Sequence, residues 1–210
     1  MSAREVFDRY FDQCPLVAII RGVTPADAAA IGRALFDGGI RIIEVPLNSP
    51  EPFASIERIA AEVGDSALVG AGTVLDPADV ERVKAAGGRI VVSPNTSPIV
   101  IRATVDAGMV SSPGIFTPSD AFTALENGAH ALKLFPAEAA SPKVVKSIRA
   151  VLPSDVPLIV VGGVTPDTVA GWMDAGADGF GLGGGLYKPG QAAEETREKA
   201  RAYVSAVARR

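Results

Sequence analysis

The stretch RIVVSPNTSPIVIRATVDAGMVSSPGIFTPSDAFTALENGAHALKLFPA, residues 89–137, decides the fold. It holds three short apolar runs, at 89–95, 109–116 and 131–137, and the two segments between them begin at Ser-Pro and Thr-Pro pairs. A hydroxyl residue followed by proline is typical of a helix start, because the hydroxyl accepts an unpaired backbone N–H and proline has no N–H to leave unpaired. Each segment ends at a glycine, which allows the left-handed turn that closes many helices. The stretch therefore predicts three strands joined by two helices.

The same strand–helix unit recurs along the whole chain. Prolines preceded by a capping residue occur at Thr24-Pro25, Ser49-Pro50, Asp76-Pro77, Ser97-Pro98, Thr117-Pro118, Ser141-Pro142 and Thr165-Pro166, and Lys188-Pro189 adds an eighth proline without a cap. Glycines that can end the helices lie within 37–39, 86–88, 106–108, 126–128 and 174–176. The apolar runs between these signals are 16–22, 41–47, 67–74, 89–95, 109–116, 131–137, 157–164 and 179–186.

These runs show little alternation with polar residues, which is typical of parallel strands covered on both faces. Eight strands and eight helices at about 23 residues per unit predict an α/β fold, the closed (β/α)₈ TIM barrel. A doubly wound open sheet is the alternative. No linker interrupts the pattern, so we expect one domain over residues 1–210, with a short extra amphipathic helix at the N-terminus.

Composition excludes several classes of function. The net charge of −4 and the pI near 5.1 argue against a nucleic-acid partner or an anionic membrane surface. No apolar run reaches the roughly 20 residues that span a bilayer, and the charged N-terminus does not resemble a signal peptide. Cys14 is the single cysteine, so no disulfide forms within the chain. We expect a reducing cytoplasm, with Cys14 as a buried apolar residue.

Three charged residues lie where strands are expected. Lys133 is the one lysine of six within an apolar run, and Glu44 is the one carboxylate within such a run. Arg21 ends the first run, whereas Arg41 and Arg89 begin theirs and so belong to the opposite, structural end of the barrel. Catalytic groups of such barrels sit at the carboxyl ends of the strands. Lys133, Glu44 and Arg21 are therefore candidates for the active site.

A lysine buried inside a barrel has a lowered pKa, so part of it is a neutral amine that can attack a ketone. The protonated imine then accepts the electrons of a breaking carbon–carbon bond, and Glu44 can move the protons. A buried Lys133–Glu44 ion pair without a chemical role is the alternative. This chemistry needs no cofactor, and no cluster of ligand residues predicts a metal site. His130 precedes its strand, so we interpret it as structural.

Glycines at the ends of the last two strands predict a phosphate site. The pairs Gly162-Gly163 and Gly183-Gly184 can bring backbone N–H groups close to an anion, and barrels most often bind phosphate after strands 7 and 8. Thr73 offers a hydroxyl at the mouth of the third strand, which can bind a substrate carboxylate or cap a turn.

From about residue 15 to residue 190 the chain resembles the class I 2-keto-3-deoxy-6-phosphogluconate and 2-keto-3-deoxy-6-phosphogalactonate aldolases. The resemblance rests on IIRG (19–22), EVPL (44–47), GAGTV (70–74), SPN (93–95), LKLFP (132–136) and GGV (162–164). It implies that Lys133 forms the Schiff base and Glu44 shuttles protons. It also implies a homotrimer that releases pyruvate and D-glyceraldehyde 3-phosphate. Thr73, Pro94 and the glycines of both pairs are then expected to bind the phosphorylated keto-acid.

Two positions favour the galactonate branch of this family. The gluconate enzymes look like E-V-T-L-R-T after strand 2, with an arginine for the substrate carboxylate, whereas this chain has Asn48 there. They also carry threonine before Gly-Gly on strand 7, where this chain has Val161. The expected substrate is thus 2-dehydro-3-deoxy-6-phosphogalactonate, with the gluconate epimer as the alternative.

One departure concerns the phosphate site. The family commonly has Ser, often followed by Asp, where this chain has Gly184 and Gly185. We therefore expect phosphate binding to depend on backbone amides and on Arg21. Two other classes remain open: a barrel sugar-phosphate isomerase or epimerase, which needs no lysine within a strand, and a sugar-phosphate-binding barrel without catalysis.

Overall fold

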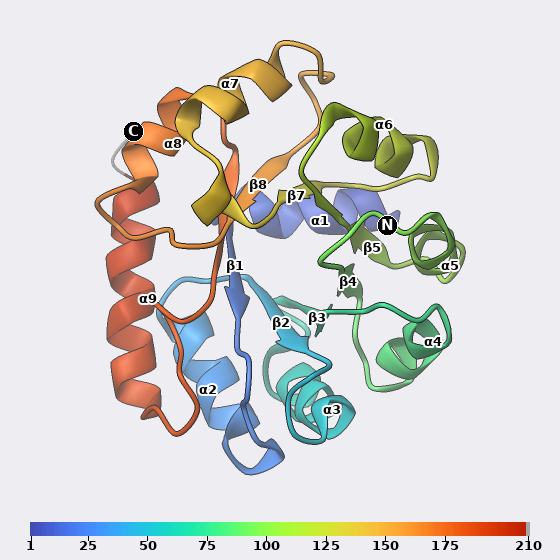
Figure 1. Cartoon of the computed structure of the whole chain (residues 1–210). Coiled ribbons are helices and arrows are strands. Elements are labelled where there is room, and N and C mark those ends of the chain that lie inside the picture. The colour runs from blue at the N-terminus through green and yellow to red at the C-terminus, as the bar shows by residue number, and fades with distance from the viewer. Residues whose placement is uncertain (209–210) are drawn as a thin grey trace.

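The computed structural model describes residues 1–208, and these fold as a barrel of parallel strands surrounded by helices (Figure 1). The strands are β1 (Leu16–Ile19), β2 (Ile42–Pro46), β3 (Leu68–Gly72), β4 (Ile90–Val92), β5 (Val110–Ser112), β6 (Gly114–Ile115), β7 (Leu132–Leu134), β8 (Leu158–Val161) and β9 (Gly179–Leu182). The helices are α1 (Ala3–Phe11), α2 (Pro25–Asp37), α3 (Pro52–Val63), α4 (Ala78–Ala85), α5 (Pro98–Asp106), α6 (Pro118–Glu126), η1 (Ala137–Ala139), α7 (Pro142–Arg149), α8 (Val169–Asp174) and α9 (Ala193–Val207).

The fifth strand of the barrel is split into β5 and β6 by Pro113, and this strand closes the ring. The strand order is β5-β4-β3-β2-β1-β9-β8-β7-β6, in which β5 pairs with β4 and β6 pairs with β7. The backbone N–H of Lys133 donates to the carbonyl of Pro113 at 2.9 Å, which joins β7 to the same bent strand. The predicted (β/α)₈ barrel is confirmed, and the open doubly wound sheet is wrong.

The proline signals locate the helix starts with different accuracy. Helices α2, α5, α6 and α7 begin at the predicted prolines, whereas α3, α4, α8 and α9 begin one to four residues later. Of the expected hydroxyl caps, Thr117 accepts the backbone N–H of Asp120 at 3.2 Å, but Thr24, Ser97 and Ser141 make no such bond. The Thr24 hydroxyl donates to the Asp27 carboxylate instead. The fixed backbone of proline thus marks these helix starts more reliably than the cap does.

The helix ends agree with the sequence. Each segment that was predicted to end a helix contains a glycine with positive φ: Gly39, Gly87, Gly108, Gly128 and Gly176.

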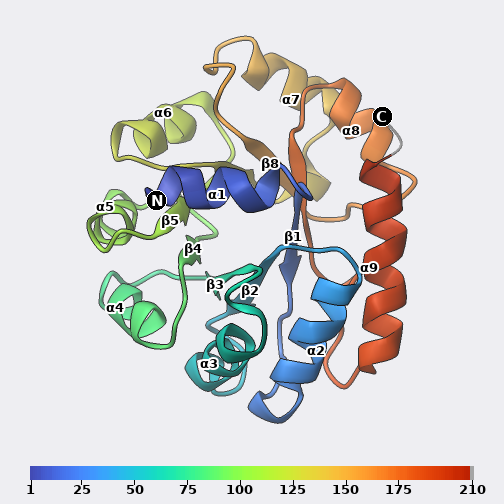
Figure 2. The same cartoon turned by 180° about the vertical axis from the view of Figure 1, so that it is seen from behind.

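Helix α1 covers the amino-terminal end of the barrel, as the view from behind shows (Figure 2). Its Phe7 is fully buried and stacks on Phe11, with 4.8 Å between ring centroids, and both pack with the side chains that fill the barrel interior. The sequence predicted this extra helix, and its apolar face closes the end of the barrel opposite the candidate active site.

The residues predicted to be structural lie at this closed end. Arg89 donates to the carbonyls of Gly64 and Ala67, and the His130 Nδ1 accepts the backbone N–H of Ser111 at 3.1 Å. Burial lowers the pKa of His130, and the charge of Arg4 on α1 lowers it further. Cys14 is buried as expected, and burial raises the pKa of its thiol to about 11.

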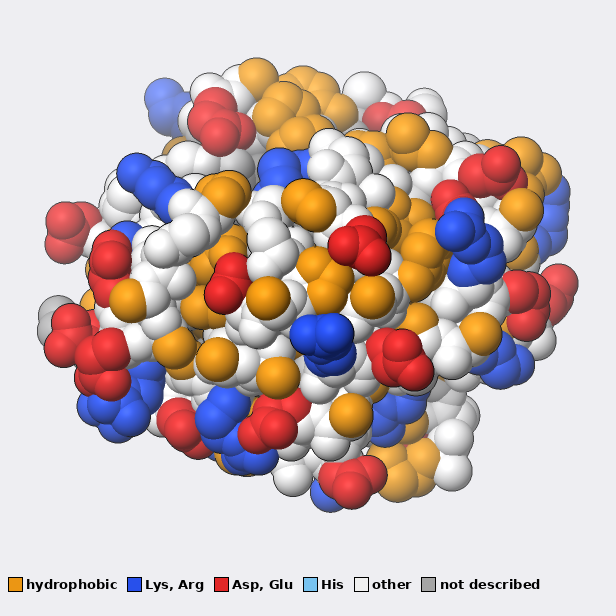
Figure 3. Space-filling model, turned by 90° about the horizontal axis from the view of Figure 1, so that it is seen from below, with side chains coloured by type: hydrophobic (Ala, Val, Ile, Leu, Met, Phe, Trp, Pro, Cys, Tyr) orange, Lys and Arg blue, Asp and Glu red, His pale blue; other side chains and the backbone are white. Residues whose placement is uncertain are grey.

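The outer surface mixes both signs of charge. Figure 3 shows one face, seen from below in the view of Figure 1, on which acidic and basic side chains are interspersed with apolar ones. Among residues 1–208, none of the helices combines the length and the apolar character that crossing a bilayer requires.

Candidate active site

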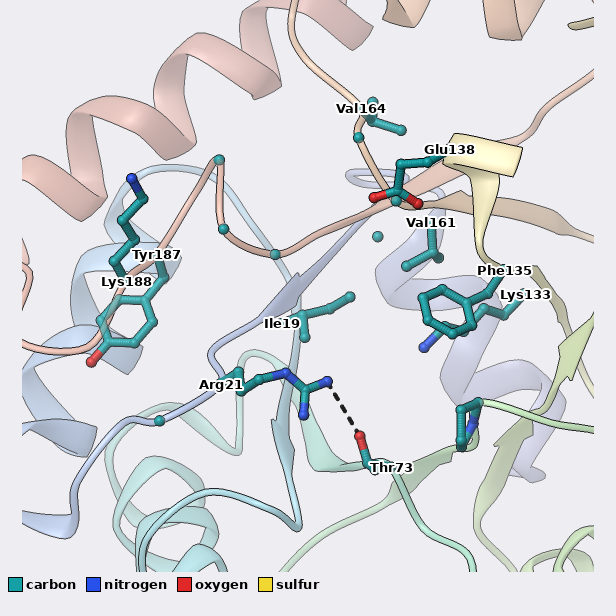
Figure 4. Close-up of a pocket in the computed structure, with 18 of the residues that line it drawn as sticks. Ile19, Arg21, Thr73, Lys133, Phe135, Glu138, Val161, Val164, Tyr187 and Lys188 are labelled. Carbon is teal, nitrogen blue, oxygen red and sulfur yellow. Dashed lines mark hydrogen bonds between the residues drawn. The ribbon is translucent and has the colours of Figure 1, made fainter. Parts of the chain in front are cut away.

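A cavity of about 670 Å³ opens at the carboxyl end of the barrel. The residues that line it come from β1, β7, β8 and β9 and from the loops that follow these strands and β3 and β4 (Figure 4). They include nine of the ten residues predicted to form the site: Arg21, Thr73, Pro94, Lys133, Val161, Gly162, Gly163, Gly183 and Gly184. The tenth, Glu44, lies below the cavity, where it borders a small internal space of about 10 Å³ together with Lys133. The fold thus brings together all the candidates, which are spread over more than 160 residues of sequence.

Strand alternation explains why Lys133 and Glu44 meet. Successive side chains of a strand point to opposite faces, and the inward positions of β2 are Ile42 and Glu44. Lys133 occupies the inward position of β7, paired with Gly114 in register. A Cβ at Gly72 would lie 1.9 Å from the Glu44 carboxylate, so glycine is required there to leave room for the acid. The local sequence therefore builds a space inside the barrel for these two charged groups.

Burial perturbs both groups in the direction that imine chemistry needs. Glu44 is 1 % exposed, and its Oε2 has no hydrogen-bond partner within residues 1–208. Burial raises the pKa of Glu44 to about 7, against the opposing effect of the positive charges of Lys133 and Arg21. Burial lowers the pKa of Lys133, the charge of Arg21 lowers it further, and Glu44 opposes both. The lowered pKa of Lys133 favours its neutral amine, and near neutral pH Glu44 can both accept and donate a proton.

Arg21 lies on the side of the cavity formed by the first three strands. Its guanidinium donates to the side chain of Asn48 and, at 3.4 Å, to the Thr73 hydroxyl. Figure 4 shows it directed toward the same part of the cavity as the Lys133 amine, and its charge acts on the pKa of both Lys133 and Glu44. Sequence reasoning expected Arg21 to bind the phosphate, and these contacts direct its guanidinium toward the part of the cavity that holds the Lys133 amine.

Two glycine loops form the opposite side of the cavity. Gly162 and Gly163 have φ values of 121° and 65°, which residues other than glycine rarely adopt. A Cβ at Gly162 would lie 2.0 Å from the Glu138 carboxylate, so that carboxylate rests against the glycine pair. At Gly183 and Gly184 a Cβ would meet no atom within 4 Å, so the second loop is open toward the cavity. The second loop can accommodate the closely approaching group that the sequence predicted, whereas the Glu138 carboxylate lies against the first.

Sequence reasoning did not assign to the site several side chains that line the cavity, among them Phe135, Glu138 and Lys188. Phe135 lies with its ring centroid 4.9 Å from the Lys133 Nζ, and Glu138 and Lys188 come from the segments after β7 and β9. All three follow their strands instead of lying within them. A search for charged residues confined to apolar runs excludes Glu138 and Lys188, which lie just past the runs 131–137 and 179–186, and it cannot find Phe135, which is uncharged.

Comparisons with known proteins agree with this geometry. The profile of the family described as "Aldolase: KDPG and KHG aldolase" matches residues 7–199. The chain is 49 % identical over 192 residues to the 2-dehydro-3-deoxy-6-phosphogalactonate aldolase of Escherichia coli (strain K12), covering 91 % of this chain and 94 % of that protein. It is 47 % identical over 192 residues to the probable enzyme of the same name from Rhizobium meliloti (strain 1021), covering 91 % of each chain.

Among solved structures, one described as "Native KDPGal structure" superposes with a TM-score of 0.91 at 48 % identity, over 93 % of this chain and 95 % of that one. The barrel with a buried lysine at its mouth and the match over nearly the whole length lead to one conclusion. The chain belongs to the KDPG and KHG aldolase family.

Proposed function

We propose that this chain is a class I aldolase that cleaves 2-dehydro-3-deoxy-6-phosphogalactonate to pyruvate and D-glyceraldehyde 3-phosphate. The observation that carries this proposal is Lys133, buried beside Glu44 and directed into a cavity whose far side consists of glycine loops. The similarity to the Escherichia coli and Rhizobium proteins supports the choice of substrate. An assay of pyruvate release from the galactonate and gluconate epimers tests the proposal, and we expect faster release from the galactonate epimer.

The geometry supports a complete reaction sequence. The Lys133 amine attacks the C2 ketone to form a carbinolamine, and Glu44 donates the proton with which water leaves. Glu44 then removes the proton of the C4 hydroxyl. The C3–C4 bond breaks, its electrons pass to the iminium to give an enamine, and glyceraldehyde 3-phosphate leaves. Protonation at C3 and hydrolysis of the imine release pyruvate and restore Lys133.

Two sides of the cavity hold the two ends of the substrate in this proposal. C1 is bonded to C2, so the group that binds the carboxylate must lie close to the Lys133 amine. Arg21 and Thr73 are hydrogen-bonded to each other there, and Pro94 is a further residue that lines the cavity. The backbone amides of the two glycine loops are proposed to bind the phosphate.

Replacing Arg21 by alanine tests whether this side of the cavity binds the substrate carboxylate. Loss of a hydrogen bond to a charged group costs roughly 1.5–3 kcal/mol, so kcat/KM should fall about 10- to 100-fold. The fall should be similar for the phosphorylated keto-acid and its phosphate-free counterpart, because both carry the carboxylate. Steady-state kinetics on the two substrates measures it, and Arg201→Ala, at an exposed site on α9, is the matched control. A loss confined to the phosphorylated substrate would assign Arg21 to the phosphate.

Val161 is proposed to decide which epimer is accepted. It is 5 % exposed at the end of β8 and borders both the cavity and the internal space that Lys133 and Glu44 share. The two epimers differ in the configuration of the C4 hydroxyl, and a threonine at this position could bind that hydroxyl whereas valine cannot. The gluconate epimer therefore gains no hydrogen bond from this position.

Changing Val161 to threonine keeps the shape of the side chain and adds a hydroxyl. The ratio of kcat/KM values should move about tenfold toward the gluconate substrate, the effect of one neutral hydrogen bond of roughly 1.4 kcal/mol. Val161→Ile, which adds no hydroxyl, is the control. A wild-type protein that already prefers the gluconate epimer, or a ratio that Val161→Thr leaves unchanged, would contradict this proposal.

We also propose that the enzyme acts as a homotrimer in the cytoplasm. Several large apolar side chains are exposed on the single chain, as expected for a surface that another copy covers: Leu75, Ile99, Phe116, Phe122 and Val151. The buried, single cysteine fits a reducing compartment. Sedimentation or light scattering tests the assembly. The sugar-phosphate isomerase or epimerase that the sequence left open as an alternative is not supported, because the chain belongs to an aldolase family.

A further inference from the structure

The segment after β9 carries a cation that the proposed mechanism does not use. Lys188 lines the active-site cavity, and within residues 1–208 its side chain makes neither a hydrogen bond nor an ion pair. Lys199 on the neighbouring helix is different, because it pairs with Glu195 at 2.7 Å and donates to Gln191 at 2.8 Å. An unpaired cation on the border of a cavity is available to a ligand.

The backbone holds Lys188 in a defined place although its side chain is exposed. The N–H groups of Leu186 and Tyr187 both donate to the carbonyl of Gly183, at 2.9 and 3.0 Å, and Tyr187 is buried. On the other side, the ring of Pro189 packs against Gly22, where a Cβ would lie 2.6 Å from its Cγ. Lys188 is thus fixed beside the loop of glycines 183–185.

The charges of the cavity are distributed along its length. Figure 4 shows Lys133 and Lys188 at opposite ends, with Arg21 between them. Arg21 is occupied by Asn48 and Thr73 near the Lys133 end. The proposed substrate carries its carboxylate next to the reacting ketone and its phosphate four carbons away, so a different cation is available to each of its two anionic ends.

The phosphate end also needs a cation in this chain. The Glu138 carboxylate rests against Gly162 and repels an anion bound at that loop. Gly184 and Gly185 offer no hydroxyl to the phosphate, and the space above Gly184 is open. A lysine binds phosphate as a point charge and adapts its flexible side chain to the position of the anion.

We propose that Lys188 binds the phosphate of the substrate at the loop of glycines 183–185 and sets the preference for phosphorylated keto-acids. This inference rests on the proposed function. Because the phosphate does not react, its contact with Lys188 is the same in the ground state and the transition state, and the contact acts on KM and leaves kcat unaffected.

Lys188→Ala tests the inference, with Lys188→Arg as the conservative variant. Lys84→Ala is the matched control, because Lys84 is an exposed lysine on α4, away from the cavity. Lys188→Ala should raise KM for the phosphorylated substrate about tenfold and leave kcat within about twofold, since it removes one charge-assisted contact of an exposed side chain. Lys188→Arg and Lys84→Ala should stay close to wild type.

Two further measurements separate this inference from the proposed function. Trapping of pyruvate at Lys133 with borohydride involves no phosphate, so Lys188→Ala should not change it. Binding of inorganic phosphate, measured by calorimetry, requires no turnover. It should weaken about tenfold in Lys188→Ala, because the variant lacks one charge-assisted contact to the phosphate. An unchanged KM, unchanged phosphate binding, or slower pyruvate trapping in Lys188→Ala overturns the role of Lys188. A wild-type protein that binds phosphate through Lys188 but traps no pyruvate overturns the proposed function alone.

Discussion

Lys133→Ala should reduce the cleavage of 2-dehydro-3-deoxy-6-phosphogalactonate by about 10⁴-fold or more, because the variant cannot form the imine that accepts the electrons of the C3–C4 bond. The side chain is 7 % exposed, and burial lowers its pKa, so removing it removes a desolvated charge. We therefore expect the variant to fold. Pyruvate release measured with a coupled dehydrogenase gives the rate, and circular dichroism shows whether the barrel is intact.

Lys84→Ala provides the matched control for this variant, because it removes an exposed lysine far from the cavity. Its activity should equal that of the wild type. A folded Lys133→Ala protein that keeps more than about a tenth of the wild-type turnover would mean that another group performs the chemistry, since loss of a covalent nucleophile has a far larger effect.

Glu44→Gln should slow turnover by about 10²- to 10⁴-fold, the usual contribution of a general acid–base group. Glutamine has nearly the same shape but cannot take up the C4 hydroxyl proton. Pyruvate trapping at Lys133 should become slower without being abolished. The buried Oε2 of Glu44 has no hydrogen-bond partner in the described residues, so the change should not lower stability. Near-normal turnover in a folded Glu44→Gln protein would count against the proton shuttle.

The pH dependence gives an independent test of Glu44. Burial raises its pKa from 4.5 to about 7, and bond cleavage needs the ionised carboxylate. In the wild type kcat/KM should rise with pH up to about 7, and Glu44→Gln should remove that rise. Because the folded pKa lies above the unfolded one, the stability that protonated Glu44 contributes is present below pH 4.5 and is lost as the pH rises through about 7. Denaturant titrations should show this decline in wild type and not in Glu44→Gln.

The fold could be predicted because its signals are local and repeated. Each proline and each terminal glycine restricts the backbone by itself, so the alternation of strands and helices can be recognised without tertiary information. The division of the fifth strand at Pro113 could not be predicted, since it depends on how β5 and β6 pair with different neighbours. The late starts of α8 and α9 depend likewise on the loops that form the cavity.

The site could be predicted where a charge lies in an apolar strand. Lys133 and Glu44 stand out because burying a charge is costly unless the charge is used or paired. Arg21 was identified, but its place in the cavity could not be predicted, because it depends on side-chain contacts with Asn48 and Thr73, which follow other strands. Lys188 lies in a loop of glycines and prolines, and its sequence alone does not distinguish it from an ordinary surface lysine.

Borohydride trapping with pyruvate tests the central claim most directly. Reduction of the wild-type protein in the presence of pyruvate should add one reduced pyruvyl group, and peptide mass spectrometry should locate it on Lys133. Lys133→Ala should remain unlabelled under the same conditions. Label on any other lysine, or label that persists in Lys133→Ala, would contradict the assignment of this chain as a Schiff-base aldolase acting through Lys133.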